Sequence, residues 1–335
     1  MKILKTAAAA LLAVAGLVLI AGILVPDTYR VERTAVIQAP PEFVFRHVQF
    51  WRNWQEWLPW AEQDTSLSVA VVGQDGEPGA AYQWSGKNAG KGEMTSTGVS
   101  FPERFEYRLR FAKPWKSEAS GFWALADSAG RTFATWGFEG RMPYPFNALR
   151  LFMQLEKRIG RDLDRGLARL TSVCEKQMAD VSGYAIQDVR LPARTYLAVR
   201  KTIGMSGMQE FFAESYGRLT EAMEKNRIRA AGAPCGLYYA WDEAIETSDM
   251  AAAVPVAGNP TLPGFTTIRL PAGKAYATDY RGSYDKSQNA HLAFELFFNA
   301  NGVSPKLPCI EEYITDPSRE ADSAKWLTRI YYYVE

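Results

Sequence analysis

Two adjacent glutamates near the carboxyl end, Glu311 and Glu312, stand in a run that favours a β-strand. The run Pro308–Asp316 is rich in β-branched and aromatic residues, and a turn signal follows it. Because successive side chains of a strand point to opposite faces, Glu311 shares one face with Cys309 and Tyr313. Glu312 then lies on the other face, with the isoleucines. If the isoleucine face packs on helices, Glu311 is left among aromatic side chains on the opposite side.

A carboxylate in such a place can do three different things. Aromatic walls remove its hydration, which raises the pKa of a carboxyl group and suits general acid or base catalysis with a neighbouring tyrosine. A bound lipophilic cation has the opposite effect on the pKa, so the same group can serve as a counter-ion, supported by cation–π contacts. The third alternative is a solvated charge on an open sheet. The residues alone leave all three open.

The last third of the chain contains an internal repeat. Each copy has a strand-like segment, then a helical stretch, then a strand that begins with Pro-Cys. The paired segments are Arg190–Ala193 with Arg269–Ala272, Met208–Asn226 with Ser283–Asn301, and Pro234–Asp242 with Pro308–Asp316. Two β-α-β-β units related by a pseudo-twofold axis would bury the faces of their sheets against those helices.

The alignment of the two copies pairs Glu311 with Leu237, so only the second copy carries the acid. Tyr313 is paired with Tyr239 in the same way. If the two units share a groove along the pseudo-axis, its lining is apolar and aromatic with one carboxylate, which is the composition of a small-molecule pocket. The predicted ligand-binding residues are Leu237, Tyr239, Trp241, Glu311 and Tyr313.

Several short motifs follow one another in this third: Trp241-Asp242, Leu270-Pro271-Ala272-Gly273, Gly282-Ser283-Tyr284-Asp285, Ile310-Glu311-Glu312-Tyr313 and Trp326-Leu327-Thr328. Through them, residues 183–335 resemble the GyrI-like small-molecule-binding domain, the effector-binding domain of AraC-type and MerR-type regulators. The resemblance implies that Glu311 lies at the floor of an aromatic groove and meets cationic, lipophilic ligands. It also implies that some members are hydrolases of activated small molecules that use this glutamate with a tyrosine. No helix-turn-helix precedes the domain, which argues against transcription regulation.

The middle of the chain reads as a curved sheet with one long helix. A strand at 29–37 is followed by short helices, and a run of antiparallel strands is punctuated by turn residues. The predicted strands are 67–72, 80–84, 93–99, 104–111, 117–125 and 131–138. Apolar residues then recur every three or four positions from Leu149 to Val173, which predicts a long amphipathic helix. Residues 179–183 are small and polar and are predicted to be a linker.

The entry Val31–Phe45 and the segment Trp54–Trp60 make residues 29–178 resemble the START-like, polyketide cyclase-like (SRPBCC) superfamily. The resemblance implies a helix-grip fold with an apolar ligand cavity, and it says little about chemistry. The tryptophans of this region have two interpretations. They rim the cavity or meet a membrane interface, or they pack the short helices onto the sheet, and we favour packing because of how deeply Trp is usually buried.

The first residues predict a membrane anchor, residues 1–26. From Ala7 to Val25 the chain carries no charge, and as a helix this run would span ~28 Å, close to the thickness of a bilayer core. Lys2 and Lys5 precede it, which places the amino terminus in the cytoplasm and the domains on the extracytoplasmic side of a single-pass protein. A cleaved signal peptide is the alternative. It requires a small-x-small site before Pro26, and the sequence has no convincing one.

The composition argues against nucleic-acid binding, a metal site and a disulfide framework. The net charge of +1 gives no field that would attract nucleic acid. His47 and His291 are the only histidines and sit in predicted helices of different domains, so we predict no metal site and no cofactor. His291 reads as an ordinary helix residue. Three cysteines do not make a disulfide framework, and whether Cys235 and Cys309 pair stays open.

The predicted fold is α+β: a transmembrane helix, a helix-grip START-like domain and a duplicated GyrI-like domain. The leading hypothesis is a membrane-anchored binding protein for apolar or amphipathic small molecules, cationic ones included, with Glu311 as the acidic group. Non-enzymatic binding is favoured. The alternatives are a hydrolase that uses Glu311 and Tyr313 as acid and base, and a carboxy-terminal domain that docks a protein partner.

Overall fold

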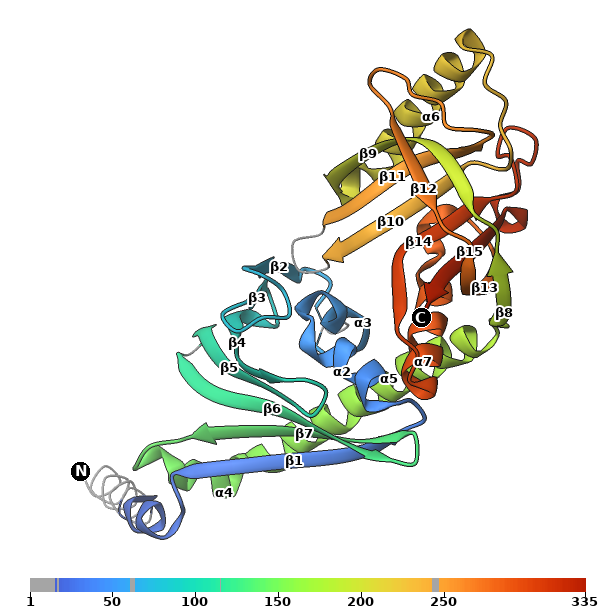
Figure 1. The fold of residues 1–335 in the computed structure, drawn as a ribbon. Helices are drawn as coiled ribbons and strands as arrows, with labels where there is room; N and C mark the ends of the chain where they lie inside the picture. The colour runs from blue at the N-terminus through green and yellow to red at the C-terminus, as the bar shows by residue number, and fades with distance from the viewer. Residues whose placement is uncertain (1–15, 17, 61–63, 115, 243–246) are drawn as a thin grey trace, which may run out of the picture. The chain divides into compact units, whose positions relative to one another are not determined.

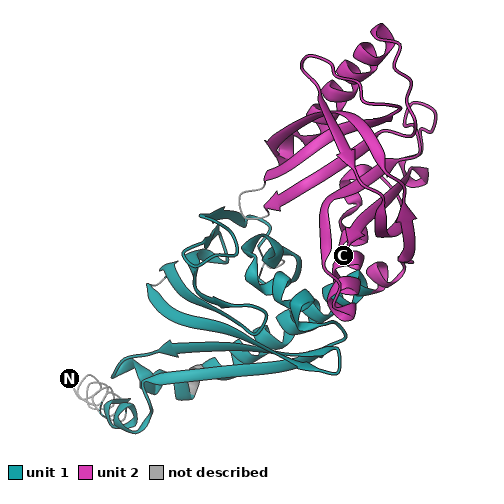
Figure 2. Cartoon of the chain, viewed as in Figure 1, with its two compact units in different colours: residues 1–178 teal, residues 179–335 magenta. Residues whose placement is uncertain are grey.

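The computed structural model describes residues 16, 18–60, 64–114, 116–242 and 247–335. The chain divides into two compact units, residues 1–178 and residues 179–335 (Figure 2). Each unit has its own sheet and helices (Figure 1).

Unit 1 is built on a seven-stranded antiparallel sheet with the order β1-β7-β6-β5-β4-β3-β2. Consecutive strands are neighbours except for β1, which closes onto β7. All six strands predicted after the first are confirmed, because alternation and Gly or Asp turns predict hairpins well. The strands are β1 (Thr28–Ile37), β2 (Ser68–Val72), β3 (Ala81–Gly86), β4 (Gly90–Ser100), β5 (Arg104–Lys113), β6 (Ser117–Ser128) and β7 (Arg131–Arg141).

The long helix α5 (Leu155–Ser182) packs against this sheet. The predicted apolar pattern starts earlier, at Leu149, but Gln154 adopts a left-handed conformation with φ +46 and separates the short helix α4 (Arg150–Met153) from α5. The contact between helix and sheet depends on Gly166, where a Cβ would lie 2.4 Å from Cζ3 of Trp136. The predicted linker at 179–183 is largely helical, since α5 runs to Ser182.

Tryptophans form the core of unit 1. Trp51, Trp54 and Trp57 are fully buried on 3₁₀ helix η1 (Trp51–Asn53) and helix α3 (Trp54–Trp57), directly after α2 (Pro41–Gln49). Each of these three indole N–H groups donates to a backbone carbonyl, those of Ala80, Val48 and His47 respectively, so the burial of these donors is compensated. The packing interpretation is confirmed for these three, and the interpretation that they rim a cavity is wrong.

Unit 2 is an eight-stranded antiparallel sheet with the order β12-β9-β11-β10-β14-β15-β13-β8. The order is symmetric about the β10–β14 pair, which confirms the predicted duplication and pseudo-twofold axis. Each half also has a short leading strand that pairs with the other half: β8 with β13, and β12 with β9. The strands are β8 (Gln187–Leu191), β9 (Arg194–Gly204), β10 (Cys235–Asp242), β11 (Thr247–Val256), β12 (Thr266–Leu270), β13 (Gly273–Arg281), β14 (Pro305–Tyr313) and β15 (Leu327–Val334).

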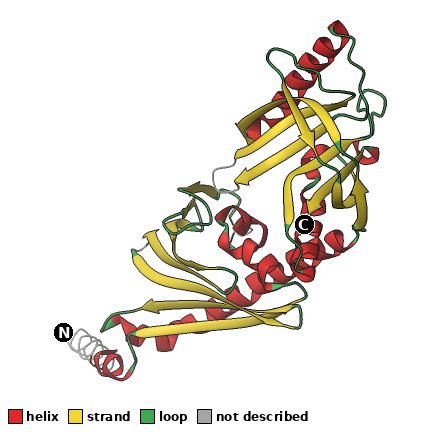
Figure 3. Ribbon diagram, in the orientation of Figure 1, coloured by secondary structure: helices red, strands yellow, loops and turns green. Residues whose placement is uncertain are grey.

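The two faces of this sheet have different cores. Helices α6 (Met208–Lys225) and α7 (Gln288–Asn301) pack on one face, each over its own apolar cluster (Figure 3). The other face carries a third cluster, made of strand residues alone, in which alanines and tyrosines predominate. A side chain's face therefore decides whether it meets a helix.

The predicted anchor lies mostly outside the described residues. Residues 18–24 are helical, and the helix ends before Pro26. In the part of the chain that the structure describes, no helix is both long and apolar enough to cross a membrane. The transmembrane segment therefore stays a prediction.

Candidate functional site

Strand pairing at the pseudo-twofold axis places Glu311 on the helix side of the sheet. In the register of β10 and β14, Gly236 stands opposite Glu311 and Leu237 opposite Ile310. Leu237 and Ile310 belong to the strand-only cluster, whereas Cys309 belongs to the cluster under α7. Alternation then points Glu311 toward the helices. The isoleucine face packs in the strand-only cluster and not on helices, so the condition stated for the sequence is not met and Glu311 itself faces the helices.

The predicted groove lining is only partly brought together. Tyr313 and Glu311 lie on the same face, and the ring of Trp241 reaches within 6.5 Å of the Tyr238 ring. Leu237 and Tyr239 pack in the strand-only cluster instead, so the prediction that they line one groove with Glu311 is wrong.

The missed partner is Tyr238, the residue between those two. The repeat alignment pairs Leu237 with Glu311, but the sheet places Leu237 on the opposite face, so the alignment is one residue out of phase with the sheet. In a strand, a slip of one residue moves every side chain to the opposite face.

Glu311 is buried and fully hydrogen-bonded. Its carboxylate is only 5% exposed. One oxygen accepts a hydrogen bond from the Tyr313 hydroxyl at 3.1 Å and another from the Tyr238 hydroxyl at 3.2 Å. The other oxygen lies 2.6 Å from Nε2 of His291 and 3.4 Å from the hydroxyl of Ser287. These five residues are called the Glu311 cluster below.

His291 carries the positive charge that balances Glu311. Burial by itself would lower the pKa of His291, but hydrogen bonds to Cys309 and Glu311 outweigh it and raise the pKa to about 10. The imidazolium therefore donates from Nε2 to Glu311 and from Nδ1 to the Tyr332 hydroxyl, 2.9 Å away. Sequence reasoning missed this residue. The signal was its spacing, since Ser287 and His291 stand four apart and so share one helix face.

Aromatic rings surround the polar groups. Around the ring of Tyr313, those of Tyr284, Phe212 and Tyr216 lie at centroid distances of 4.8, 6.2 and 6.5 Å. All four side chains are partly exposed. Burial raises the pKa of Tyr313 and of Tyr238 well above its usual value, which keeps both hydroxyls protonated and able to donate.

The close approach of the two tyrosines to Glu311 requires a glycine on the neighbouring strand. A Cβ on Gly236 would lie 2.6 Å from the Tyr313 hydroxyl and 2.9 Å from Cε2 of Tyr238. Real Cβ atoms do not come this close to other atoms. The space above Gly236 is therefore what lets the two rings meet over the carboxylate.

Glu312 is equally buried but is committed to a different contact. It points to the opposite face, where Nη1 of Arg194 lies 3.2 Å away and the Tyr331 hydroxyl donates at 3.0 Å. Its exposure of 7% matches that of Glu311. Cys235 lies on the Glu312 face and Cys309 on the Glu311 face, and both are free thiols, so the two cysteines do not pair.

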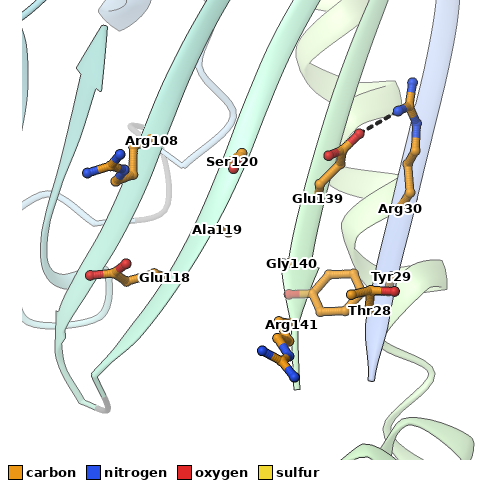
Figure 4. Close-up of a pocket in the computed structure, with 10 residues that line it drawn as sticks. All are labelled: Thr28, Tyr29, Arg30, Arg108, Glu118, Ala119, Ser120, Glu139, Gly140 and Arg141. Atoms are coloured by element: carbon orange, nitrogen blue, oxygen red, sulfur yellow. Dashed lines mark hydrogen bonds and ion pairs between the residues drawn. The ribbon is translucent and has the colours of Figure 1, made fainter. Parts of the chain in front are cut away.

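Unit 1 has a separate depression of about 620 Å³ where β5, β6, β7 and β1 run side by side (Figure 4). Its lining is mostly polar and charged, and Arg30 donates to Glu139 at 2.5 Å inside it. It opens to solvent and is unlike the apolar cavity that the START-like resemblance implies. Its lining residues are Thr28, Tyr29, Arg30, Arg108, Glu118, Ala119, Ser120, Glu139, Gly140 and Arg141.

Two family models match the chain, one for each unit. Residues 28–175 match the family described as polyketide cyclase, dehydrase and lipid transport, and residues 185–335 match the GyrI-like small molecule binding domain. The chain is therefore a polyketide cyclase-like domain of the SRPBCC type followed by a GyrI-like small-molecule-binding domain, as the sequence predicts. No curated protein matches the chain.

Solved structures give distant likenesses. A cryo-EM structure of an EcmrR–DNA complex is 19% identical, covers 56% of this chain and 71% of its own, and has a TM-score of 0.44. Protein CV1439 from Chromobacterium violaceum is 20% identical, with coverages of 45% and 98% and a TM-score of 0.34. SAV2435 bound to tetraphenylphosphonium is 17% identical, with coverages of 45% and 93% and a TM-score of 0.35. These values are too low to transfer a function.

Proposed function

We propose that unit 2 binds an apolar or amphipathic small molecule at the Glu311 cluster. The observation that carries the proposal is a buried carboxylate, held by two tyrosine hydroxyls and a histidine, beside partly exposed aromatic rings. Exposed faces of aromatic side chains bind apolar ligand bodies, and the few fixed polar groups orient the ligand.

Charge narrows the choice of ligand. Because His291 already balances Glu311, the buried pair is neutral as a whole, and a lipophilic cation has to share the carboxylate with the imidazolium. Neutral ligands that exchange hydrogen bonds with the hydroxyls of Tyr238 and Tyr313 avoid this competition. Cations remain ligands through the tyrosine rings and Glu311, with the proton of His291 as their competitor.

Catalysis by Glu311 and Tyr313 is the second candidate, favoured by the 3.1 Å contact between the Tyr313 hydroxyl and the carboxylate. A general base needs a free acceptor position toward the substrate. Both oxygens of Glu311 already accept hydrogen bonds from the protein. For this reason we place binding before hydrolysis.

We further propose that residues 1–26 anchor the protein in a membrane, with both units on the extracytoplasmic side. The uncharged run Ala7–Val25 and the preceding Lys2 and Lys5 support the proposal. A topology reporter fused after Glu335 tests the orientation. Activity of a reporter that works only in the cytoplasm would contradict it.

Calorimetric titration of the full chain tests the binding site. The probes are tetraphenylphosphonium, a lipophilic cation, and triphenylphosphine oxide, a neutral molecule of similar shape. Glu311→Gln replaces charge-assisted hydrogen bonds by neutral ones, a loss of about 1.4 kcal/mol, so we expect the Kd of the cation to rise about tenfold.

Glu312→Gln is the matched control, because Glu312 is the next residue, is equally buried and faces away from the site. Its Kd values should stay within about twofold of those of the unmodified chain. Absence of binding by the unmodified chain, or the same loss in both variants, would reject the proposed role of Glu311. Turnover of an activated ester that disappears in Glu311→Gln would establish the hydrolase instead.

A further inference from the structure

Large apolar side chains gather on the surface of unit 1 where the amino-terminal helix ends. They come from two segments, the helical residues 18–24 and residues 144–151, which contain the 3₁₀ helix η2 (Phe146–Leu149) and the start of α4. Ile23 is 75% exposed and Phe146 is 61% exposed, which is unusual for side chains of this size. The set, called the basal patch below, comprises Ile20, Ile23, Leu24, Phe146, Leu149 and Leu151.

Hydrogen bonds hold the two segments together. The side-chain amide of Asn147, itself only 2% exposed, donates to the carbonyl oxygens of Gly22 and Val25, both at 2.7 Å. Arg150 donates to the carbonyl of Thr28 at 2.8 Å, just beyond the helix. Because the last carbonyls of a helix lack partners within it, Asn147 acts as its cap. Residues 144–151 are therefore fixed to the end of the amino-terminal helix.

The location of the patch identifies what covers it. The described helical residues 18–24 belong to the uncharged run Ala7–Val25, and Gly22 lies about 4.5 Å along the helix axis from Val25 at 1.5 Å per residue. If the run spans a bilayer, its last turn lies at the level of the lipid headgroups. Side chains hydrogen-bonded to that turn are then at the same level. Tyr144, which is 51% exposed, is a residue type that favours this level, and the exposed ring of Phe146 adds apolar surface in the same segment.

We propose that residues 144–151 are a second membrane contact, which lies in the lipid interface beside the amino-terminal anchor. The inference rests on the anchor proposed above. A second contact beside the anchor limits how far unit 1 can tilt on the bilayer. The depression of Figure 4 begins at Thr28 and Arg141, the end of the β1–β7 ladder nearest the patch, so lipid would lie close to its mouth.

An environment-sensitive dye tests the contact in the full chain. Phe146→Cys introduces a labelling site, because the native cysteines Cys174, Cys235 and Cys309 are buried. The labelled protein is reconstituted into phosphatidylcholine and phosphatidylglycerol vesicles that contain lipids with a nitroxide quencher on the acyl chain. We expect strong quenching and a blue-shifted emission at position 146.

Phe133→Cys is the matched control. Phe133 is an exposed phenylalanine of the same ladder, but it pairs with Val36, eight positions from the Thr28–Arg141 pair. At about 3.4 Å per residue it stands roughly 27 Å from the basal patch, so its dye should not be quenched. A dye at Leu24→Cys, at the end of the helix, reports the anchor itself.

The outcomes separate the inference from the anchor. Quenching at positions 24 and 146 but not at 133 supports the second contact. Quenching at position 24 alone overturns it and leaves the anchor in place. A third outcome is a blue shift at position 146 that increases with protein concentration and is not accompanied by quenching. It also overturns the inference, because another copy of the chain then covers the patch. Absence of quenching at all positions rejects both the contact and the anchor.

Discussion

His291 and Glu311 form a pair whose proton is shared between a helix and a strand. The imidazole of His291 comes from α7 and the carboxylate of Glu311 from β14, so the charge of one holds the other in place across the layers of unit 2. The raised pKa of His291 is therefore a measure of how strongly folding favours the charged form.

This pairing predicts how the stability of unit 2 depends on pH. The pKa of His291 is raised to about 10 in the folded chain, from an ordinary value of about 6.5. The folded state therefore binds more protons than the unfolded state between these values, and the stabilisation is full below pH ~6.5 and lost as the pH rises through ~10. Denaturant unfolding of the full chain and of His291→Asn, compared from pH 6 to 10.5, should show a difference that shrinks with increasing pH.

His47 in unit 1 provides a control with the opposite sign. Burial lowers the pKa of His47 to about 4, more than its hydrogen bond to Gln177 raises it. The stability linked to His47 is thus lost on acidification below pH ~6.5 and is insensitive to alkaline pH. If His291→Asn and His47→Asn showed the same pH profile, the assignment of the charged form to His291 would be wrong.

The sequence predicts that Glu311 is the site carboxylate, but it does not predict all the residues that hydrogen-bond to it. Glu311 and Tyr313 follow from the alternation of one strand, which is a local property. Tyr238 reaches the carboxylate through the pairing of β10 with β14, and His291 reaches it through the packing of α7 on the sheet, both of which depend on residues far apart in the chain. The predicted face of Leu237 and Tyr239 is wrong because the repeat alignment is one residue out of phase with the strand pairing.

Strands are the elements that the sequence predicts best in this chain. In unit 1, Gly and Asp turns mark the hairpins, and every predicted strand is present. Helix ends are less accurate, because the apolar pattern continues through Gln154 although its backbone breaks the helix. Neither turn residues nor an apolar repeat marks the short helix α3. Its position follows from the burial of its tryptophans in the core of unit 1.

The tryptophan core predicts a large loss of stability on truncation. Trp54 is fully buried, and its ring lies within 4.6 to 4.7 Å of the rings of Trp51 and Trp57. Trp54→Ala should lower the free energy of unfolding of unit 1 by about 3–5 kcal/mol, from lost burial and the cavity left behind. Denaturant unfolding measures it, with the surface change Phe133→Ala as the control. A loss of under about 1 kcal/mol would mean that the core is not packed as described.

At the scale of the whole chain, two families joined in one polypeptide have separate cores, and both were predicted from short motifs. The duplication in unit 2 was visible because repeated motifs survive in order. The sequence does not show that β8 and β12 pair with the opposite halves, because strands of five residues have too little periodicity to be recognised.

That exchange has a consequence for how unit 2 can be taken apart. Each half lends its first strand to the other, so neither half holds a complete sheet by itself. Cutting the chain in the exposed loop at 257–265 yields two fragments, 1–260 and 261–335. The unit 2 part of the first fragment and the whole of the second should be unstable alone and should reassemble when the two are co-expressed. Recovery of the pair by a tag on one fragment measures the reassembly. The two halves of unit 2 therefore depend on each other for a complete sheet, and the loop that joins them ensures that they are made in equal amounts.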